Sequence, residues 1–322
     1  MDDAADTDAA LVGTTLAEAA TLVADRREGV DEETARATLS SVAEDDELTV
    51  DSIHDALAYA AKVVSTPATR AEFAGLDIGD AREAASDVAD VDTVDARLAA
   101  FEERLGEIES RVAALDEDLQ TLAARAGERS EGAVPDDVFA FARDLGQLEA
   151  RANEQQGAAD ELAMEVEEFE RWLSSPSARH EELAADVSDL SSAVDRLGDD
   201  VDAVVDGDGD ANLWFDCLLR RRVLSLQVRD LEAEVSDLRT LVQRADDVPS
   251  DHTGRLDGAV DDLADLDSEL ADAEQRLDAV ATPEWRDRFD DRLDAFDDDL
   301  DSVSPPVPWG RVLRALEAAR SE

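Results

Sequence analysis

The apolar residues from Val91 onward recur at alternating spacings of three and four, which is typical of the seam of a coiled coil. The first stripe runs from Val91 to Ala126 and a second runs from Val138 to Leu173, so the two have nearly equal lengths. Between them, residues 127–137 contain glycines and a proline, which favour a turn. The pattern predicts an antiparallel hairpin of two helices, each about 54 Å long at about 1.5 Å per residue.

Further amphipathic stretches follow, and residues that commonly cap or break helices separate them. The second stripe continues in phase to Val204 across Ser175 and Pro176, a helix cap followed by a proline suited to the first helical position. Thr282 and Pro283 repeat this pair later in the chain. The predicted segments are coiled-coil helices over 91–205 with breaks near 127–137 and 174–177, an acidic Gly/Asp turn over 206–212, coiled-coil helices over 213–303 with breaks near 247–255 and 281–283, and a Pro-rich turn with a short C-terminal helix over 304–322.

Residues 1–90 carry shorter, alanine-rich amphipathic segments in place of long stripes. Helix caps and apolar spacings predict four short helices in this region. Four such helices can pack together as a small bundle. They lie over 11–27, 31–42 and 51–64 and from Thr66 onward, with Pro67 at the first helical position of the fourth. The sequence thus predicts an all-α protein in which a small N-terminal helical bundle is followed by long antiparallel coiled-coil helical hairpins.

The chain carries a very large negative charge, which indicates a high-salt environment. Acidic residues number 83 against 30 basic ones, and Lys62 is the only lysine, so the formal net charge is −53. Salt shortens the Debye length from about 10 Å at 0.1 M to about 3 Å at 1 M, so brine tolerates a charge density that dilute buffer does not. Hydrated carboxylates also keep a protein soluble at high salt. We therefore expect a protein of an extreme halophile.

The composition disfavours several classes of function. A chain this acidic lacks the clustered Lys and Arg that contact phosphates, so we expect no direct binding to DNA or RNA. One cysteine and three widely separated histidines offer no metal site, and no cofactor is implied. The sequence contains no glycine-rich phosphate loop, nucleophile elbow or HExxH motif, so we expect no enzymatic activity. The acidic start MDDAADTDAA and the short apolar runs predict a cytoplasmic protein without a transmembrane segment.

The turn that follows Val204 alternates aspartate with glycine and is a weak candidate for a cation loop. Asp206, Asp208 and Asp210 would supply oxygen ligands to a hard cation. However, Cys217 stands where a Ca²⁺ loop needs its closing glutamate, and Ala211 stands where it needs glycine. A flexible turn explains the same residues, so no metal is predicted.

The most apolar and most basic place in the chain follows this turn and is a candidate site for docking a protein partner. Trp214 and Phe215 precede three consecutive arginines, Arg220, Arg221 and Arg222. Aromatic and arginine side chains together favour an acidic helix or anionic lipid heads as the partner. The alternative is a packed helix start whose arginines pair with neighbouring acidic helices. The one cysteine nearby is expected to be buried and reduced.

Residues 58–120 resemble acidic coiled-coil proteins of haloarchaea that carry the label halo transducer protein; the stretch reads AYAAKVVSTPATRAEFAGLDIGDAREAASDVADVDTVDARLAAFEERLGEIESRVAALDEDLQ. The likeness covers the N-terminal segments and the first coiled-coil helix, and the label implies signal transduction. This chain departs from chemotaxis transducers because it shows no pair of transmembrane segments and no glutamate-rich signalling tip. The resemblance therefore implies no particular mechanism.

The expected function is that of a scaffold or adaptor that binds protein partners through helical surfaces, because helices with apolar stripes account for most of the chain. Two alternatives stay open. One is a cytoplasmic signal-transduction component, and the other is an accessory to chromosome organisation that would rely on ATPase heads of another protein. A homo-oligomer would form if the helices stay extended, since a second copy must then cover their seams.

Overall fold

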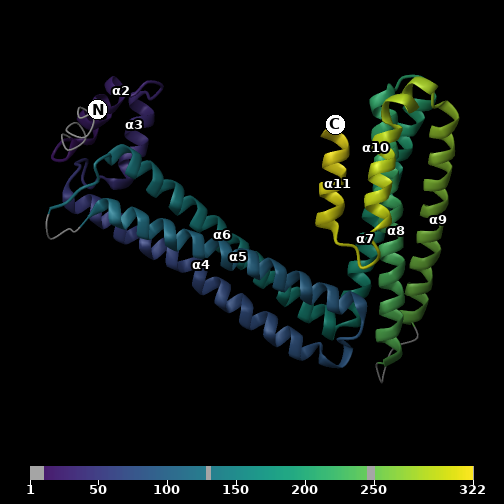
Figure 1. Cartoon of the computed structure of the whole chain (residues 1–322). Helices are drawn as coiled ribbons and strands as arrows, with labels where there is room; N and C mark the ends of the chain where they lie inside the picture. The colour runs from purple at the N-terminus through teal and green to yellow at the C-terminus, as the bar shows by residue number, and fades with distance from the viewer. Residues whose placement is uncertain (1–10, 128–131, 245–250, 322) are drawn as a thin grey trace. The chain divides into compact units, whose positions relative to one another are not determined.

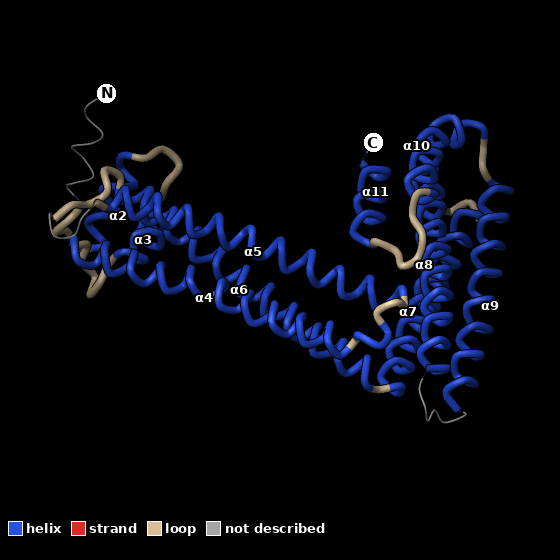
Figure 2. Tube along the Cα trace, turned by 60° about the horizontal axis from the view of Figure 1, so that its bottom comes forward, coloured by secondary structure: helices blue, strands red, loops and turns tan. Residues whose placement is uncertain are grey.

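The computed structural model describes residues 11–127, 132–244 and 251–321, and these ranges are almost entirely helical (Figure 1). They contain ten α-helices, short 3-10 helices and isolated β-bridges, and no strand (Figure 2). The all-α class is therefore confirmed for these residues. The helices are α2 (Leu16–Arg26), α3 (Glu32–Leu39), α4 (Val50–Ala84), α5 (Asp92–Ala126), α6 (Val138–Ser174), α7 (Pro176–Val205), α8 (Ala211–Arg244), α9 (Asp251–Val280), α10 (Pro283–Asp301) and α11 (Trp309–Ser321), with 3-10 turns η2 (Ser40–Val42) and η3 (Ser86–Val88).

The chain folds into two compact units. Unit 1 comprises Met1–Glu83 and Leu98–Glu168, and unit 2 comprises Ala84–Arg97 and Phe169–Glu322. Helices α5 and α6 therefore each contribute residues to both units. The divisions predicted from the sequence follow chain order, whereas these units join segments that are distant in the chain.

Unit 1 contains three long helices, α4, α5 and α6, and the short helices α2 and α3. Residues of the predicted stripes, such as Leu115 on α5 and Leu145 on α6, are buried in its core. Helices α5 and α6 run antiparallel, because their ion pairs join earlier residues of one helix to later residues of the other. These pairs are Arg104 with Glu165, Asp118 with Arg151, and Arg125 with Asp144.

The N-terminal helices share one core with the long helices. Leu39 of α3 belongs to the same buried cluster as Phe141 of α6. The contact extends to the surface, where Arg27 donates to Asp137 at 2.6 Å. Residues 11–64 therefore pack with α5 and α6 as part of unit 1.

One predicted helix start in this region is wrong. Pro67, expected to begin a fourth short helix, lies inside the 35-residue helix α4. A proline in a helix interior removes a backbone hydrogen bond and costs roughly 3 kcal/mol. Pro67 is buried, and the buried positions on either side of it form one unbroken seam, so packing of α4 offsets this cost. The seam consists of Ala60, Val64, Pro67, Ala71, Ala74, Ile78 and Ala81.

Unit 2 contains α7, α8 and α9 packed against one another, with α10 and α11 packed against α8. Two predicted helix starts are confirmed, because the Ser175 and Thr282 side chains accept backbone N–H bonds at 3.2 and 3.3 Å. Pro176 and Pro283 follow as the first residues of α7 and α10. Two predicted breaks fall partly outside the described residues, namely at 128–131 in the break near 127–137 and at 247–250 in the break near 247–255.

Candidate functional site

The aromatic residues of the predicted docking patch lie in the core of unit 2. Trp214 is 1% exposed and Phe215 is 5% exposed. The Trp214 Nε1–H donates to the carbonyl oxygen of Leu277 at 3.1 Å, and the Phe215 ring stacks on Phe289 with 4.4 Å between ring centroids. Cys217 is buried beside them, and burial raises the pKa of its thiol. These side chains therefore stabilise the junction of α8, α9 and α10.

The three arginines of the predicted patch are bound within unit 2. Each pairs with a carboxylate on a neighbouring helix: Arg220 with Asp200, Arg221 with Glu274, and Arg222 with Asp297. Their side chains are only 28%, 17% and 17% exposed. This geometry is that of a packed helix start, the alternative to a docking surface. A docking role for these arginines stays a prediction that their placement does not favour.

Two aspartates of the acidic turn, Asp206 and Asp210, cap the ends of helices. Asp206 is the C-terminal cap of α7. Asp210 begins α8 by accepting backbone N–H bonds from Asn212 and Leu213, both at 2.9 Å. The bond from Leu213 is the main reason why the pKa of Asp210 lies below its usual value. Within the described ranges, no group of three His, Cys, Asp or Glu side chains comes together where a metal ion could bind, and Asp208 joins none.

A buried polar cluster, which the sequence analysis missed, surrounds Trp172 in unit 2. The Trp172 side chain is 1% exposed, and two guanidinium groups lie near its ring, 4.6 Å (Arg97) and 5.7 Å (Arg179) from the ring centroid. Arg179 also donates to the carbonyl oxygens of Trp172 and Leu173 at 3.0 and 2.9 Å. Its charge therefore satisfies carbonyls at the C-terminal end of α6, where the helix dipole favours a cation.

Arg97 is shared by two carboxylates in this cluster. It lies 2.6 Å from Glu182 on α7 and 3.3 Å from Glu234 on α8. Burial raises the pKa of Glu234 to about 7; Arg97 opposes the shift, while Glu182, Asp186 and Asp230 add to it. Burial likewise raises the pKa of Asp186. The cluster thus holds more acidic groups than one arginine neutralises, and Glu234 titrates near neutral pH.

Glu234 is expected to make unit 2 less stable as the pH rises. Its pKa in the folded chain, about 7, exceeds its ordinary value of 4.5, so between these values the folded state binds more protons than the unfolded state. The contribution of this group to the free energy of unfolding is therefore fully present below about pH 4.5 and is lost as the pH rises through about 7. We expect Glu234→Gln to remove this loss, so that the variant is more stable than the native chain at about pH 8.

Urea denaturation at high salt, followed by tryptophan fluorescence, measures this effect. All four tryptophans lie in unit 2, so their emission reports on that unit. Glu232→Gln is the matched control, because Glu232 is an exposed carboxylate on the same helix. Parallel pH profiles of the native chain and Glu234→Gln would contradict the assignment.

Two of the three histidines lie together, although they are far apart in the sequence. The rings of His180 and His252 are 4.7 Å apart between centroids. The His180 ring nitrogens lie 2.7 Å from the carbonyl oxygen of Pro176 and 3.0 Å from that of His252. These contacts join the start of α7 to the start of α9. No local spacing in the sequence connects the two histidines, and only the fold brings them together.

Two large apolar side chains are exposed side by side on α4 in unit 1. Phe73 is 54% exposed and Leu76 is 61% exposed. A separation of three residues places them next to each other on the helix surface. Among the described residues, the other large apolar side chains that are exposed are Tyr59, Met164, Val205 and Leu313.

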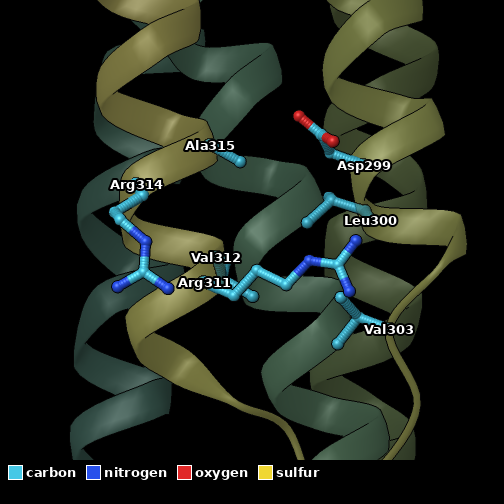
Figure 3. A pocket seen from close by; sticks show the side chains of 7 residues that line it. All are labelled: Asp299, Leu300, Val303, Arg311, Val312, Arg314 and Ala315. Carbon is cyan, nitrogen blue, oxygen red and sulfur yellow. The ribbon is translucent and has the colours of Figure 1, made fainter.

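A small pocket lies between α10 and α11 in unit 2 (Figure 3). Its volume is about 260 Å³. Figure 3 shows Arg311 reaching from α11 towards α10, while the guanidinium of Arg314 points to the other side of Val312. Arg311 donates to the Ser302 hydroxyl at 2.6 Å. The pocket is lined by Asp299, Leu300, Val303, Arg311, Val312, Arg314 and Ala315.

Among the described residues, no helix combines the length and the apolar character that crossing a membrane requires. The comparisons with known family models, curated proteins and solved structures found no match.

Proposed function

We propose that the chain is a non-enzymatic scaffold or adaptor that binds partner proteins through its helix surfaces in a high-salt cytoplasm. In this proposal the long helices act as antiparallel coiled-coil hairpins that present side chains to a partner helix. The observation that carries it is the exposed apolar pair Phe73 and Leu76 on α4. Other apolar residues of the same helix, such as Val64 and Ile78, are buried, whereas these two form an adjacent exposed pair and Tyr59 is exposed singly.

High salt is the physical reason why an apolar pair suits this role. Charges separated by more than about 3 Å are largely screened at about 1 M salt, so long-range attraction between charged surfaces contributes little. Burial of apolar surface keeps its value and gives roughly 25 cal/mol per Å² removed from water. A helix that covers Phe73 and Leu76 would therefore gain most of its binding free energy there.

Replacing both side chains is expected to weaken partner binding strongly. The test captures partners with the tagged full chain from its host, lysed in multimolar KCl, and compares it with Phe73→Ser/Leu76→Ser. Because two large apolar contacts are lost, we expect recovery of the specific partner to fall by about tenfold or more, the effect of about 1.4 kcal/mol.

The matched control is Met164→Ser/Leu313→Ser, which removes two apolar side chains of similar exposure, 60% and 54%, from other helices. Equal recovery with both double variants would mean that the α4 pair is not the contact. Failure to recover any protein with the native chain would count against a scaffold.

A further inference from the structure

We propose that the helix covering Phe73 and Leu76 is α4 of a second copy of this chain, packed antiparallel across a two-fold axis. The inference rests on the proposed function and names the partner that the exposed apolar pair binds. Three observations carry it: an exposed stripe with coiled-coil spacing, a run of surface without carboxylates, and a pattern that complements itself when one copy is reversed.

The exposed pair belongs to a longer row of residues on α4, which we name the α4 stripe. Its members recur at alternating steps of three and four, the spacing of a coiled-coil seam. Its large apolar side chains are 54% to 61% exposed, whereas the buried seam that begins at Ala60 lies on the other side of the helix. The described part of unit 1 therefore covers one seam of α4 and leaves the other open. The α4 stripe consists of Tyr59, Lys62, Thr66, Thr69, Phe73 and Leu76.

The two threonines at the centre of the α4 stripe suit a buried contact. The Thr66 hydroxyl donates to the carbonyl oxygen of Lys62 at 3.0 Å, and the Thr69 hydroxyl donates to that of Ser65 at 3.5 Å. Both hydroxyls are thus satisfied within α4, so a partner can cover them without leaving a buried polar group unpaired.

The charge around the α4 stripe explains why a second copy can approach here. Residues 56–71 form the longest run of the sequence without aspartate or glutamate, and they contain its one lysine, Lys62. Two chains that each carry a net charge of −53 repel each other where acidic surfaces meet. Contact across 56–71 brings no carboxylates of this run together, so apolar burial by the α4 stripe meets little opposition there.

The α4 stripe also complements itself in an antiparallel pair. A two-fold axis makes every contact occur twice, with the roles of the two copies exchanged. An axis between Thr66 and Thr69 places these small residues opposite each other and places large side chains opposite large ones on either side. Lys62 then lies against Phe73 of the second copy, and a cation over an aromatic ring is a favourable contact. The outermost pair is Tyr59 with Leu76.

The mass of the purified full chain in multimolar KCl, measured by light scattering after size-exclusion chromatography, tests for the dimer. The interface is small, so we expect the mass to rise from one chain to two around a Kd of about 10 μM. Thr66→Asp/Thr69→Asp would bury opposed carboxylates at the axis and is expected to weaken association about a hundredfold or more.

The matched control is Thr21→Asp/Thr121→Asp. Both are exposed threonines elsewhere in unit 1 whose hydroxyls bond the carbonyl four residues earlier, as Thr66 does. An unchanged far-UV circular-dichroism spectrum verifies that each double variant is folded. A native chain that stays monomeric at several hundred micromolar, or equal association of the two double variants, would overturn the proposal.

Disulfide trapping tests the antiparallel register. Thr66→Cys and Thr69→Cys are made as separate chains, and the native Cys217 is buried and should not react. We expect cross-linked dimers mainly when the two chains are mixed, because residue 66 of one copy faces residue 69 of the other. Equally fast cross-linking of either chain with itself would refute this register.

The second copy and the scaffold fail separately, because purified chain tests the first and host lysate tests the second. A monomeric chain that captures a different protein through Phe73 and Leu76 would overturn the second copy and leave the scaffold standing. A dimer that captures only itself would support the second copy and overturn a scaffold for other proteins.

Discussion

Transfer of the chain from about 3 M KCl to about 0.1 M KCl is expected to remove most of its helical circular-dichroism signal. Thirty basic residues cannot neutralise 83 acidic ones, so most of the repulsion has no internal compensation. On α10, for example, Asp290, Asp294 and Asp298 are exposed at spacings of four, an arrangement in which like charges destabilise a helix. Dilution from about 3 M to about 0.1 M lengthens the Debye length roughly fivefold and restores this repulsion.

The control separates charge screening from a general effect of concentrated solutes. NaCl at equal ionic strength should restore the helical signal, whereas sucrose at equal osmolality should restore little of it. Trp fluorescence, which reports on unit 2, should change together with the far-UV signal. An unchanged spectrum in dilute buffer would show that packing alone overcomes the repulsion, and the halophile interpretation would fail.

Trp214→Ala is expected to destabilise unit 2 by about 3 to 5 kcal/mol, the usual cost of truncating a buried aromatic side chain. Trp214 is 1% exposed and lies 5.9 Å from Trp285 and 6.4 Å from Phe289 between ring centroids. Its loss leaves a cavity among these rings and also orphans the carbonyl oxygen of Leu277, which costs about 1 to 3 kcal/mol more if it stays buried. Urea denaturation at high salt, followed by the remaining tryptophans, measures the change.

Two further variants separate the cavity from the hydrogen bond. Trp214→Phe keeps an aromatic ring but not the bond to Leu277, so we expect a loss of about 1 to 3 kcal/mol. Leu313→Ala removes a side chain that is 54% exposed and should change the free energy of unfolding by less than about 0.5 kcal/mol. Similar stabilities for Trp214→Ala and Leu313→Ala would contradict the burial of Trp214.

Helix starts with a local signal were predictable. Ser175 with Pro176, and Thr282 with Pro283, begin α7 and α10 as expected, because a cap acts on backbone groups two or three residues away. Pro67 carries a similar local signal, preceded by Thr66, yet lies inside α4. There the seam of buried apolar residues continues on both sides of the proline, and tertiary packing outweighs the cost of the proline.

The sites were less predictable than the helices. The sequence of Trp214 and the arginines that follow it is compatible with a surface patch as well as with a packed helix start, and only burial distinguishes the two. The cluster at Arg97 had no sequence signal, since its partner Glu234 lies 137 residues away. The pocket arginines Arg311 and Arg314 lie on a short C-terminal helix that was predicted without any site.

Neighbours along the chain were enough to determine the helical class, the apolar seams and the capped starts of α7 and α10, because hydrogen bonds and side-chain spacing within a helix act over a few residues. The tertiary structure decided which segments join each unit, that Trp214 is buried, and that the pKa of Glu234 rises to about 7. Desolvation and charge pairing depend on what covers a side chain, and here distant helices provide that cover.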